Sequence, residues 1–308
     1  MNKIEKYSRM LVGLDLSEMD RHAVSYASMI AKVLEINAVY FLHVTSSLEL
    51  PQEIADKYGD VMAPVDETLE KEMEETVEKY FTKPPHCSVE VEANAGDVTE
   101  EVLKWAKVKR VDLIVLGRKN KLTGTGLHSK KVARTTSASV IFVPENPSLQ
   151  LKKLMVPIDY SKYSQMAFEL SADIQKVTSA KILSNHVYKV PTGYYKAGKT
   201  YEEFAEIMLD NTKKESKKFF AKLGLNDVDF DFTYALDDDI HPADKIYKTA
   251  SEEGVDLILL GSKGRSTAAA MLIGSVAEKL LQESTDIPIF LVKKGNENVS
   301  LIEAILRL

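Results

Sequence analysis

Short apolar segments alternate with longer amphipathic segments along the whole chain. In the second half this pattern predicts strands near 153–158, 180–187, 229–235, 256–260 and 288–292. It predicts helices near 162–177, 201–223, 242–253 and 274–284. Leu257-Ile258-Leu259-Leu260 lacks polar residues altogether, which is typical of a strand covered on both faces. Strands and helices in this alternation predict βαβ units around a parallel sheet.

The pattern occurs twice. Val111–Gly117 recurs as Val255–Gly261, 144 positions later, and Met10–Ser17 recurs as Leu154–Ser161 at the same offset. Two separated segments with one offset indicate an internal duplication. The boundary falls at Pro144–Ser148, whose two prolines cannot donate backbone hydrogen bonds. We therefore expect two similar domains, 1–148 and 149–308.

The amino-acid composition limits which classes of binding partner and which cellular compartment we expect for this protein. The 308 residues allow two domains, and 46 acidic against 40 basic residues give a net charge of −6, which disfavours nucleic acid and anionic membranes. The single cysteine, Cys87, cannot form an internal disulfide, and the apolar run near the N-terminus is short for a signal sequence. We expect a cytoplasmic protein that binds neither nucleic acid nor membrane.

A glycine-rich loop follows the fourth predicted strand of the second half. Gly261-Ser262-Lys263-Gly264 is followed, after nine further residues, by Gly274-Ser275 at the start of a predicted helix. Ligands of parallel α/β sheets bind beyond the carboxyl ends of the strands, and glycines there allow close backbone approach. A helix N-terminus with Lys263 and Arg265 nearby suits a phosphate chain. The alternative is that the glycines only turn the chain and cap the helix.

The motif G-x2-G-x9-G-S, with Asp159 in the setting Val156-Pro157-Ile158-Asp159-Tyr160-Ser161, resembles the universal stress protein domain. The resemblance covers residues 151–293 and, more loosely, 6–144. It implies an α/β fold of two tandem, doubly wound, parallel five-stranded sheets of order 3-2-1-4-5. Because such domains commonly pair through their fifth strands, it also implies an intramolecular pseudo-dimer that joins 140–143 to 289–292.

The resemblance further implies one site for ATP or AMP in the second domain, with Mg²⁺ a companion of ATP. Base and ribose would lie against the first two strands, and the phosphates against the glycine-rich loop. The nucleotide-binding residues carried over are Pro157, Ile158, Asp159, Val187, Leu260, Gly261, Lys263, Gly264, Gly274, Ser275 and Val276. For Asp159 three roles remain open: bonding adenine or ribose, holding a divalent cation, or capping the following helix.

The first domain departs from the motif. Its loop reads Gly117-Arg118-Lys119-Asn120-Lys121, so an asparagine replaces the second glycine, and neither His128-Ser129 nor Lys130-Lys131 restores the Gly-Ser pair. The resemblance implies that this domain is degenerate for ATP. Its basic cluster either holds another anion or is a solvated loop; the cluster comprises Arg118, Lys119, Lys121, Lys130 and Lys131.

Other candidates carry weaker signals. His43 and His186 end equivalent strands, and we expect packed imidazoles because no Cys/His pair has zinc spacing. The acidic run 237–239 either binds a cation or is solvated. The tyrosine-rich connection 188–204 covers the nucleotide, contacts a partner or packs locally. The apolar face of 299–308 predicts a C-terminal helix that docks on its own chain or on a partner.

The resemblance implies a nucleotide-binding stress-response regulator or sensor. We expect little or no turnover and no catalytic or metal-ligating residues, because the motif holds phosphate binders but no general base to activate water. One alternative is a slow ATPase, or an adenylyl- or phosphoryl-transfer enzyme on the same fold. Another is an interaction scaffold without nucleotide. A homodimer or a regulatory protein is the expected macromolecular partner.

Overall fold

The computed structural model describes residues 7–49, 64–119, 126–225, 227–237, 240–264, 273–282 and 286–295. The chain divides into two compact units, the first comprising residues 1–150 and the second Leu151–Val292. Lys293–Gly295, the described residues that follow, belong to the first unit and not to the second, where the sequence analysis expects them. The predicted C-terminal helix lies outside the described residues.

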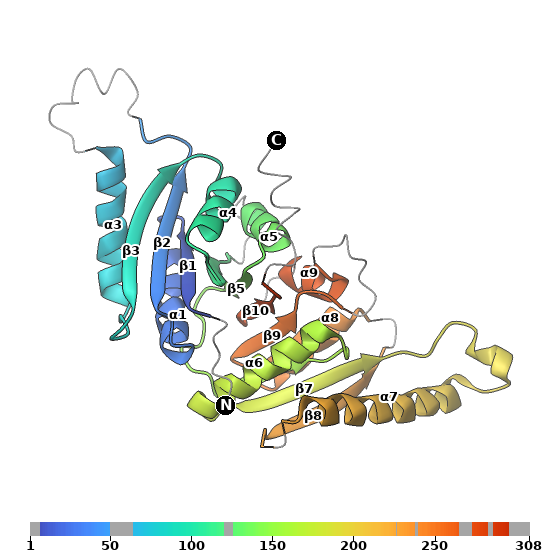
Figure 1. Ribbon diagram of the computed structural model, residues 1–308. Coiled ribbons are helices and arrows are strands. Elements are labelled where there is room, and N and C mark those ends of the chain that lie inside the picture. The colour runs from blue at the N-terminus through green and yellow to red at the C-terminus, as the bar shows by residue number, and fades with distance from the viewer. Residues whose placement is uncertain are drawn as a thin grey trace. The chain divides into compact units, whose positions relative to one another are not determined.

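In the first unit, strands and helices alternate around a parallel sheet of order β3-β2-β1-β4-β5 (Figure 1). The elements are β1 (Arg9–Leu14), α1 (Met19–Val33), β2 (Ala38–Thr45), α3 (Val65–Tyr80), β3 (Ser88–Ala95), α4 (Val98–Val108), β4 (Leu113–Gly117), α5 (Gly126–Thr135) and β5 (Ser139–Val143).

The second unit repeats this arrangement, with a parallel sheet of order β10-β9-β6-β7-β8 (Figure 1). Its elements are β6 (Lys153–Pro157), α6 (Lys162–Thr178), β7 (Lys181–Tyr188), η1 (Tyr194–Ala197), α7 (Tyr201–Leu223), β8 (Phe230–Leu236), α8 (Pro242–Glu252), β9 (Leu257–Gly261), α9 (Ser275–Gln282) and β10 (Ile289–Val292). The predicted α/β class with parallel sheets is confirmed.

Helices cover both faces of the sheet in the first unit. Tyr40 and Phe41 are neighbours in β2 and point to opposite faces. The ring centroid of Tyr40 lies 6.3 Å from that of Trp105 in α4. The ring centroid of Phe41 lies 5.2 Å from that of Phe81, the C-cap residue of α3. The two helices therefore lie on opposite sides of the sheet. None of the helices within the described residues is both long and apolar enough to cross a membrane.

One aspartate in each unit ties the start of the fourth strand to the start of the first. Asp112 accepts hydrogen bonds from the Ser8 and Arg9 amides at 2.9 and 3.0 Å. Asp256 accepts the equivalent pair from Lys152 and Lys153 at 2.8 and 3.0 Å. These bonds satisfy the amides of the first residue of each first strand and of the residue before it, which gives a physical reason for the repeated Val-Asp-Leu segment.

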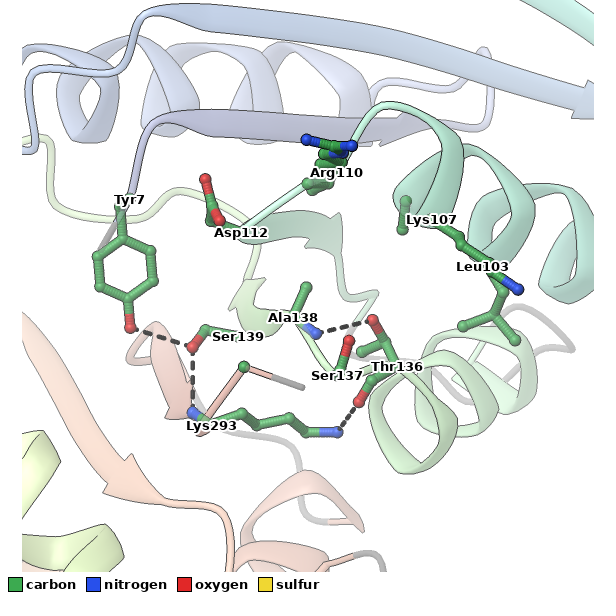
Figure 2. Close-up of a pocket in the computed structure, with 13 residues that line it drawn as sticks. Tyr7, Leu103, Lys107, Arg110, Asp112, Thr136, Ser137, Ala138, Ser139 and Lys293 are labelled. Carbon is green, nitrogen blue, oxygen red and sulfur yellow. Dashed lines mark hydrogen bonds between the residues drawn. The ribbon is translucent and has the colours of Figure 1, made fainter. Parts of the chain in front are cut away.

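A cavity of about 480 Å³ opens at the amino ends of β4 and β5, the sheet edge opposite to the one where ligands of this fold class bind. Figure 2 shows Tyr7, Ser139 and Lys293 joined along its wall. The Tyr7 hydroxyl and Ser139 Oγ are 3.0 Å apart, and Ser139 Oγ accepts the Lys293 amide at 3.0 Å. Burial raises the pKa of Tyr7 above its ordinary value, so the phenol stays protonated in this bond.

Lys293 caps the C-terminal end of α5. Its side chain is only 4% exposed, and Nζ donates to the carbonyl oxygen of Thr136 at 2.6 Å and to that of Ala133. Carbonyls at a helix C-terminus lack partners within the helix, and the negative end of the helix dipole favours a cation there. This lysine therefore satisfies backbone groups of the first unit.

We predict that Lys293→Met lowers the free energy of unfolding of the first unit by about 2 kcal/mol, because it leaves buried carbonyls without donors while keeping the apolar stem. Urea unfolding followed by far-UV circular dichroism measures the change. Lys107→Met is the matched control, since Lys107 lines the same cavity but is exposed. Equal losses in the two variants would contradict the capping role.

Candidate functional site

The second unit has a cavity of about 390 Å³ at the carboxyl ends of β6, β7 and β9. All the site residues predicted from the sequence line it: Pro157, Ile158, Asp159, Val187, Leu260, Gly261, Lys263, Gly264, Gly274, Ser275 and Val276. The loops that carry them are far apart in the sequence and converge because the strands of the unit are parallel. The cavity is also lined by residues that the sequence analysis missed, among them Asn185, Lys189, Pro242 and Ile246.

The glycine-rich loop folds back against the start of α9. Gly274 donates its amide to the Ser262 carbonyl at 2.8 Å, and Ser262 donates to the Val292 carbonyl at 3.0 Å. A Cβ on Gly274 would lie 3.3 Å from the Gly264 amide nitrogen and 3.5 Å from the Lys263 Cα. The loop thus sets Lys263 beside the N-terminal end of α9, where backbone N–H groups and the helix dipole favour an anion.

A glycine is needed at position 261 because of the packing of the neighbouring helix. A Cβ at this position would lie 2.7 Å from the Tyr163 carbonyl carbon and 2.9 Å from the Ser164 nitrogen, both in the first turn of α6. In the first unit a Cβ on Gly117 would lie 2.6 Å from the Met19 Cγ. The first glycine of the motif lets a helix approach the end of the fourth strand, and it persists where the rest of the motif is lost.

The turn between β6 and α6 is held by its own polar groups. Asp159 Oδ1 accepts the Ser161 amide at 3.0 Å, and Ser161 Oγ accepts the Ser164 amide at 3.2 Å as the N-cap of α6. Ser161 Oγ also donates to the Lys263 carbonyl at 3.4 Å, which joins this turn to the glycine-rich loop. The capping role falls to Ser161, and Asp159 supports the turn while lining the cavity.

The two strand-end histidines are packed, as predicted. His186 Nδ1 lies 2.6 Å from the Ile158 carbonyl oxygen, and its ring centroid lies 4.4 Å from that of Tyr160. His43 Nδ1 makes the equivalent contact with the Leu14 carbonyl at 3.0 Å. Nδ1 therefore carries the proton in both rings. Within the described residues no three His, Cys, Asp or Glu side chains gather as a metal site.

The tyrosine-rich connection packs locally. The Tyr194 ring centroid lies 5.5 Å from that of Tyr201 and 6.3 Å from that of Phe204, and no tyrosine is among the described residues that line the cavity. The Asp237 amide bonds the Tyr188 carbonyl at 2.6 Å, while the rest of the acidic run, 238–239, lies outside the described residues.

The first unit places different chemistry at the equivalent edge. Lys119 Nζ donates to Asp15 Oδ2 at 2.8 Å; these residues correspond to Lys263 and Asp159 of the second unit. Burial alone would raise the pKa of Asp15, but the bonds from Lys119 and Ser17 bring it below its ordinary value. One cation of the basic cluster is thus already paired with a carboxylate. Asn120 and Lys121 lie outside the described residues.

A buried carboxylate adds to this difference. Asp20 occupies the position equivalent to Ser164, a cavity-lining residue of the second unit. It accepts the amides of Asp15 and Leu16 at 3.0 and 2.8 Å and is only 6% exposed. Burial, with the nearby charge of Asp15, raises the pKa of Asp20 to about 6. Near pH 7 it carries a negative charge, which repels phosphate at this edge of the first unit.

Comparison with known proteins agrees with this geometry. The sequence model of the universal stress protein family matches residues 6–144 and 150–293, nearly the whole chain. The chain belongs to the universal stress protein family. Because the model matches twice, it is a tandem, two-domain member.

Curated universal stress proteins match this tandem member over one domain at a time. One from Methanocaldococcus jannaschii is 27% identical over 162 residues, which are 48% of this chain and 99% of that protein. The universal stress protein YxiE of Bacillus subtilis is 32% identical over 149 residues, 46% of this chain and 98% of that protein.

Solved structures match the whole chain in fold. A protein of unknown function from Pseudomonas aeruginosa covers 100% of both chains with a TM-score of 0.65 and 16% identity. A universal stress protein from Archaeoglobus fulgidus covers 93% of this chain and 98% of its own, with a TM-score of 0.57 and 18% identity.

We predict that Gly261→Ala lowers the free energy of unfolding of the second unit by about 2 kcal/mol, because the new methyl group overlaps the backbone of α6. Gly295→Ala, at a position where a Cβ meets nothing within 4 Å, serves as the control and should change stability by less than about 0.5 kcal/mol. Chemical denaturation measures both. A Gly261→Ala variant as stable as wild type would refute the packing role.

We predict that Asp20 makes the first unit less stable as the pH rises from about 4 to 7. Its pKa is about 6 in the folded chain against an ordinary 3.8, so the folded state binds the proton more tightly. The contribution is full below about pH 4 and is lost as the pH passes 6, a change of about 3 kcal/mol. The difference in free energy of unfolding between Asp20→Asn and wild type should therefore shift by about 3 kcal/mol in favour of the variant between pH 4 and pH 7.

Asp97→Asn is the control with the opposite sign. Asp97 accepts the amides of Thr99 and Glu100 as the N-cap of α4, and the Glu100 bond chiefly holds its pKa below the ordinary value. Its favourable contribution is therefore lost as the pH falls. Urea titrations at pH 4, 5, 6 and 7 measure the three proteins. A constant difference between wild type and Asp20→Asn would contradict the prediction.

Proposed function

We propose that this tandem universal stress protein binds ATP or AMP in the cavity of its second unit and acts as a stress-response regulator or sensor. The observation that carries the proposal is that all the residues predicted from the nucleotide motif line one cavity. The resemblance of the motif to that of nucleotide-binding family members supports the same assignment. A volume of about 390 Å³ also lies within the range of small-molecule pockets, about 300–1,000 Å³.

The two ends of the cavity differ in chemistry, as the two ends of a nucleotide do. Toward the glycine-rich loop lie Lys263, Ser275 and the start of α9, which suit phosphate oxygens. Toward α8 and the first two strands lie Ile158, Val187 and other apolar side chains, which suit a base. This polarity supports a nucleotide, with its base toward β7 and its phosphates toward β9.

Two observations favour binding over turnover. Asp159 is the only carboxylate among the described residues that line the cavity, and its Oδ1 already accepts the Ser161 amide. His186 donates from Nδ1 to a backbone carbonyl, which holds the ring in place. The described lining residues hold no second carboxylate that could work as a base beside Asp159, so we propose a protein that is not an enzyme.

Mg²⁺ would accompany ATP. This cation takes oxygen ligands and often retains several waters, with substrate phosphates completing its shell. Among the described lining residues only Asp159 offers a carboxylate, so the triphosphate would supply most of the remaining non-water ligands. The cytoplasmic location, a homodimer or protein partner, and the pairing of fifth strands stay predictions.

We predict one nucleotide site per chain, which Gly274→Arg abolishes. The substitution introduces a Cβ 3.3 Å from the Gly264 nitrogen and a long side chain beside the phosphate end, so the affinity for ATP should fall at least about 100-fold. Calorimetric titration of nucleotide-free protein with ATP and AMP measures it. Lys130→Ala, in helix α5 of the first unit, should bind like wild type.

Each other outcome contradicts a stated part of the proposal. Two sites per chain would contradict the degenerate first unit. Rapid multiple-turnover hydrolysis of ATP would favour the enzyme alternative, and the absence of binding to wild type would leave the scaffold. Mass spectrometry of nucleotide released from the denatured purified protein would establish which nucleotide the chain retains.

A further inference from the structure

Asn185 is a buried polar residue in the wall of the candidate site. It lies in β7, is 3% exposed and lines the cavity. Its Oδ1 atom is buried and has no hydrogen-bond partner among the described residues. A buried amide oxygen without a partner is destabilising, and buried polar groups in native proteins are rarely left so.

The register of the sheet places Asn185 at the base end of the cavity. It pairs with Pro157 of β6 and with Thr233 of β8, so β6 separates it from β9 and the glycine-rich loop. Alternation along β7 puts its side chain on the same face as Val187 and on the opposite face from His186. Pro242 and Ile246 of α8 line the same cavity, as does Lys189 just after β7.

The fold itself does not require an amide at this position. The segments Phe41–Val44 and Ser184–Val187 correspond, so Asn185 matches Leu42 of β2. Leu42 is 1% exposed and fills its place in the first unit with apolar atoms alone. Leucine and asparagine share the same branched arrangement of non-hydrogen side-chain atoms, and a leucine in β7 would leave no polar group without a partner. The amide therefore points to a function in the cavity.

We propose that Asn185 is a specificity-determining residue that recognises the amino group of the bound base. This inference rests on the proposed nucleotide site and specifies which chemical group of the ligand the site recognises. The side-chain amide offers an acceptor and a donor side by side. The edge of adenine offers the complement, an exocyclic amino group beside a ring nitrogen that accepts. Oδ1 accepts from the amino group, and Nδ2 donates to the ring nitrogen.

The test compares two ligands in two proteins. ATP and purine riboside triphosphate differ only in the 6-amino group, which the second ligand lacks. Wild type should bind ATP about tenfold more tightly, the effect of one buried hydrogen bond and the amide oxygen left without it. Asn185→Leu, which copies the first unit, should bind the two ligands within about twofold of each other, because its side chain cannot read the amino group.

Ser184→Ala is the matched control. Ser184 is the neighbouring residue, is 1% exposed, and its Oγ likewise has no partner among the described residues, but it does not line the cavity. This variant should keep the tenfold preference. If Asn185→Leu keeps the preference, or if wild type binds both ligands equally, the proposal is overturned. It is also overturned if Ser184→Ala loses the preference, because a general disturbance of β7 would then explain the effect.

A second readout separates this inference from a folding defect and from the proposed function. Without ligand, Asn185→Leu should unfold at the same or a higher urea concentration than wild type, since it removes a buried amide oxygen that lacks a partner. A marked loss of stability would mean that the amide serves the fold and would overturn the proposal. If wild type binds no nucleotide at all, the proposed function itself fails, whereas ATP binding without preference refutes only the role of Asn185.

Discussion

The close approach of the first helix to the end of the fourth strand is the constraint on which each unit depends. Gly117 and Gly261 make it possible, because a Cβ at either position would lie within 3 Å of the helix that follows the first strand. With α6 held there, its cap Ser161 reaches the Lys263 carbonyl, and the glycine-rich loop closes on the start of α9. A packing requirement of the fold thus places the phosphate end of the candidate site.

The two units share one fold but differ in the charged side chains at the carboxyl edge of the sheet. The turn before the first helix has a left-handed residue in both units, Leu16 and Tyr160, with φ of 56° and 63°. Four positions after this residue, Asp20 of the first unit corresponds to Ser164 of the second. Asp20 accepts two amides of its turn, whereas in the second unit Ser164 donates its amide to Ser161 Oγ. The carboxylate of Asp20 stabilises the turn of the first unit, but its negative charge repels phosphate. Duplication therefore preserved the architecture while binding chemistry diverged.

Most of the fold follows from the sequence because its determinants are local and repeated. Uniformly apolar strands such as 257–260 and the two copies of Val-Asp-Leu specify parallel sheets, and the glycine spacing specifies a loop at their carboxyl edge. Long-range contacts escape such reasoning. The capping of α5 by Lys293 joins residues about 160 positions apart, and Asn185 becomes informative only when its burial without a partner is known. The packing role of Gly261 likewise required the position of α6.

The fold restricts substitutions more strongly at the phosphate end of the site than at the base end. Near the phosphates, a substitution at Gly274 meets the loop backbone, so the fold itself limits what can stand there. At the base end the position of Asn185 accepts leucine in the sister unit, so the fold leaves that side chain free to vary. Selectivity for a base can then change through single wall residues without disturbing the phosphate loop. A family defined by its loop motif can therefore contain members that read different bases, and the strand-end wall is where such differences should be sought.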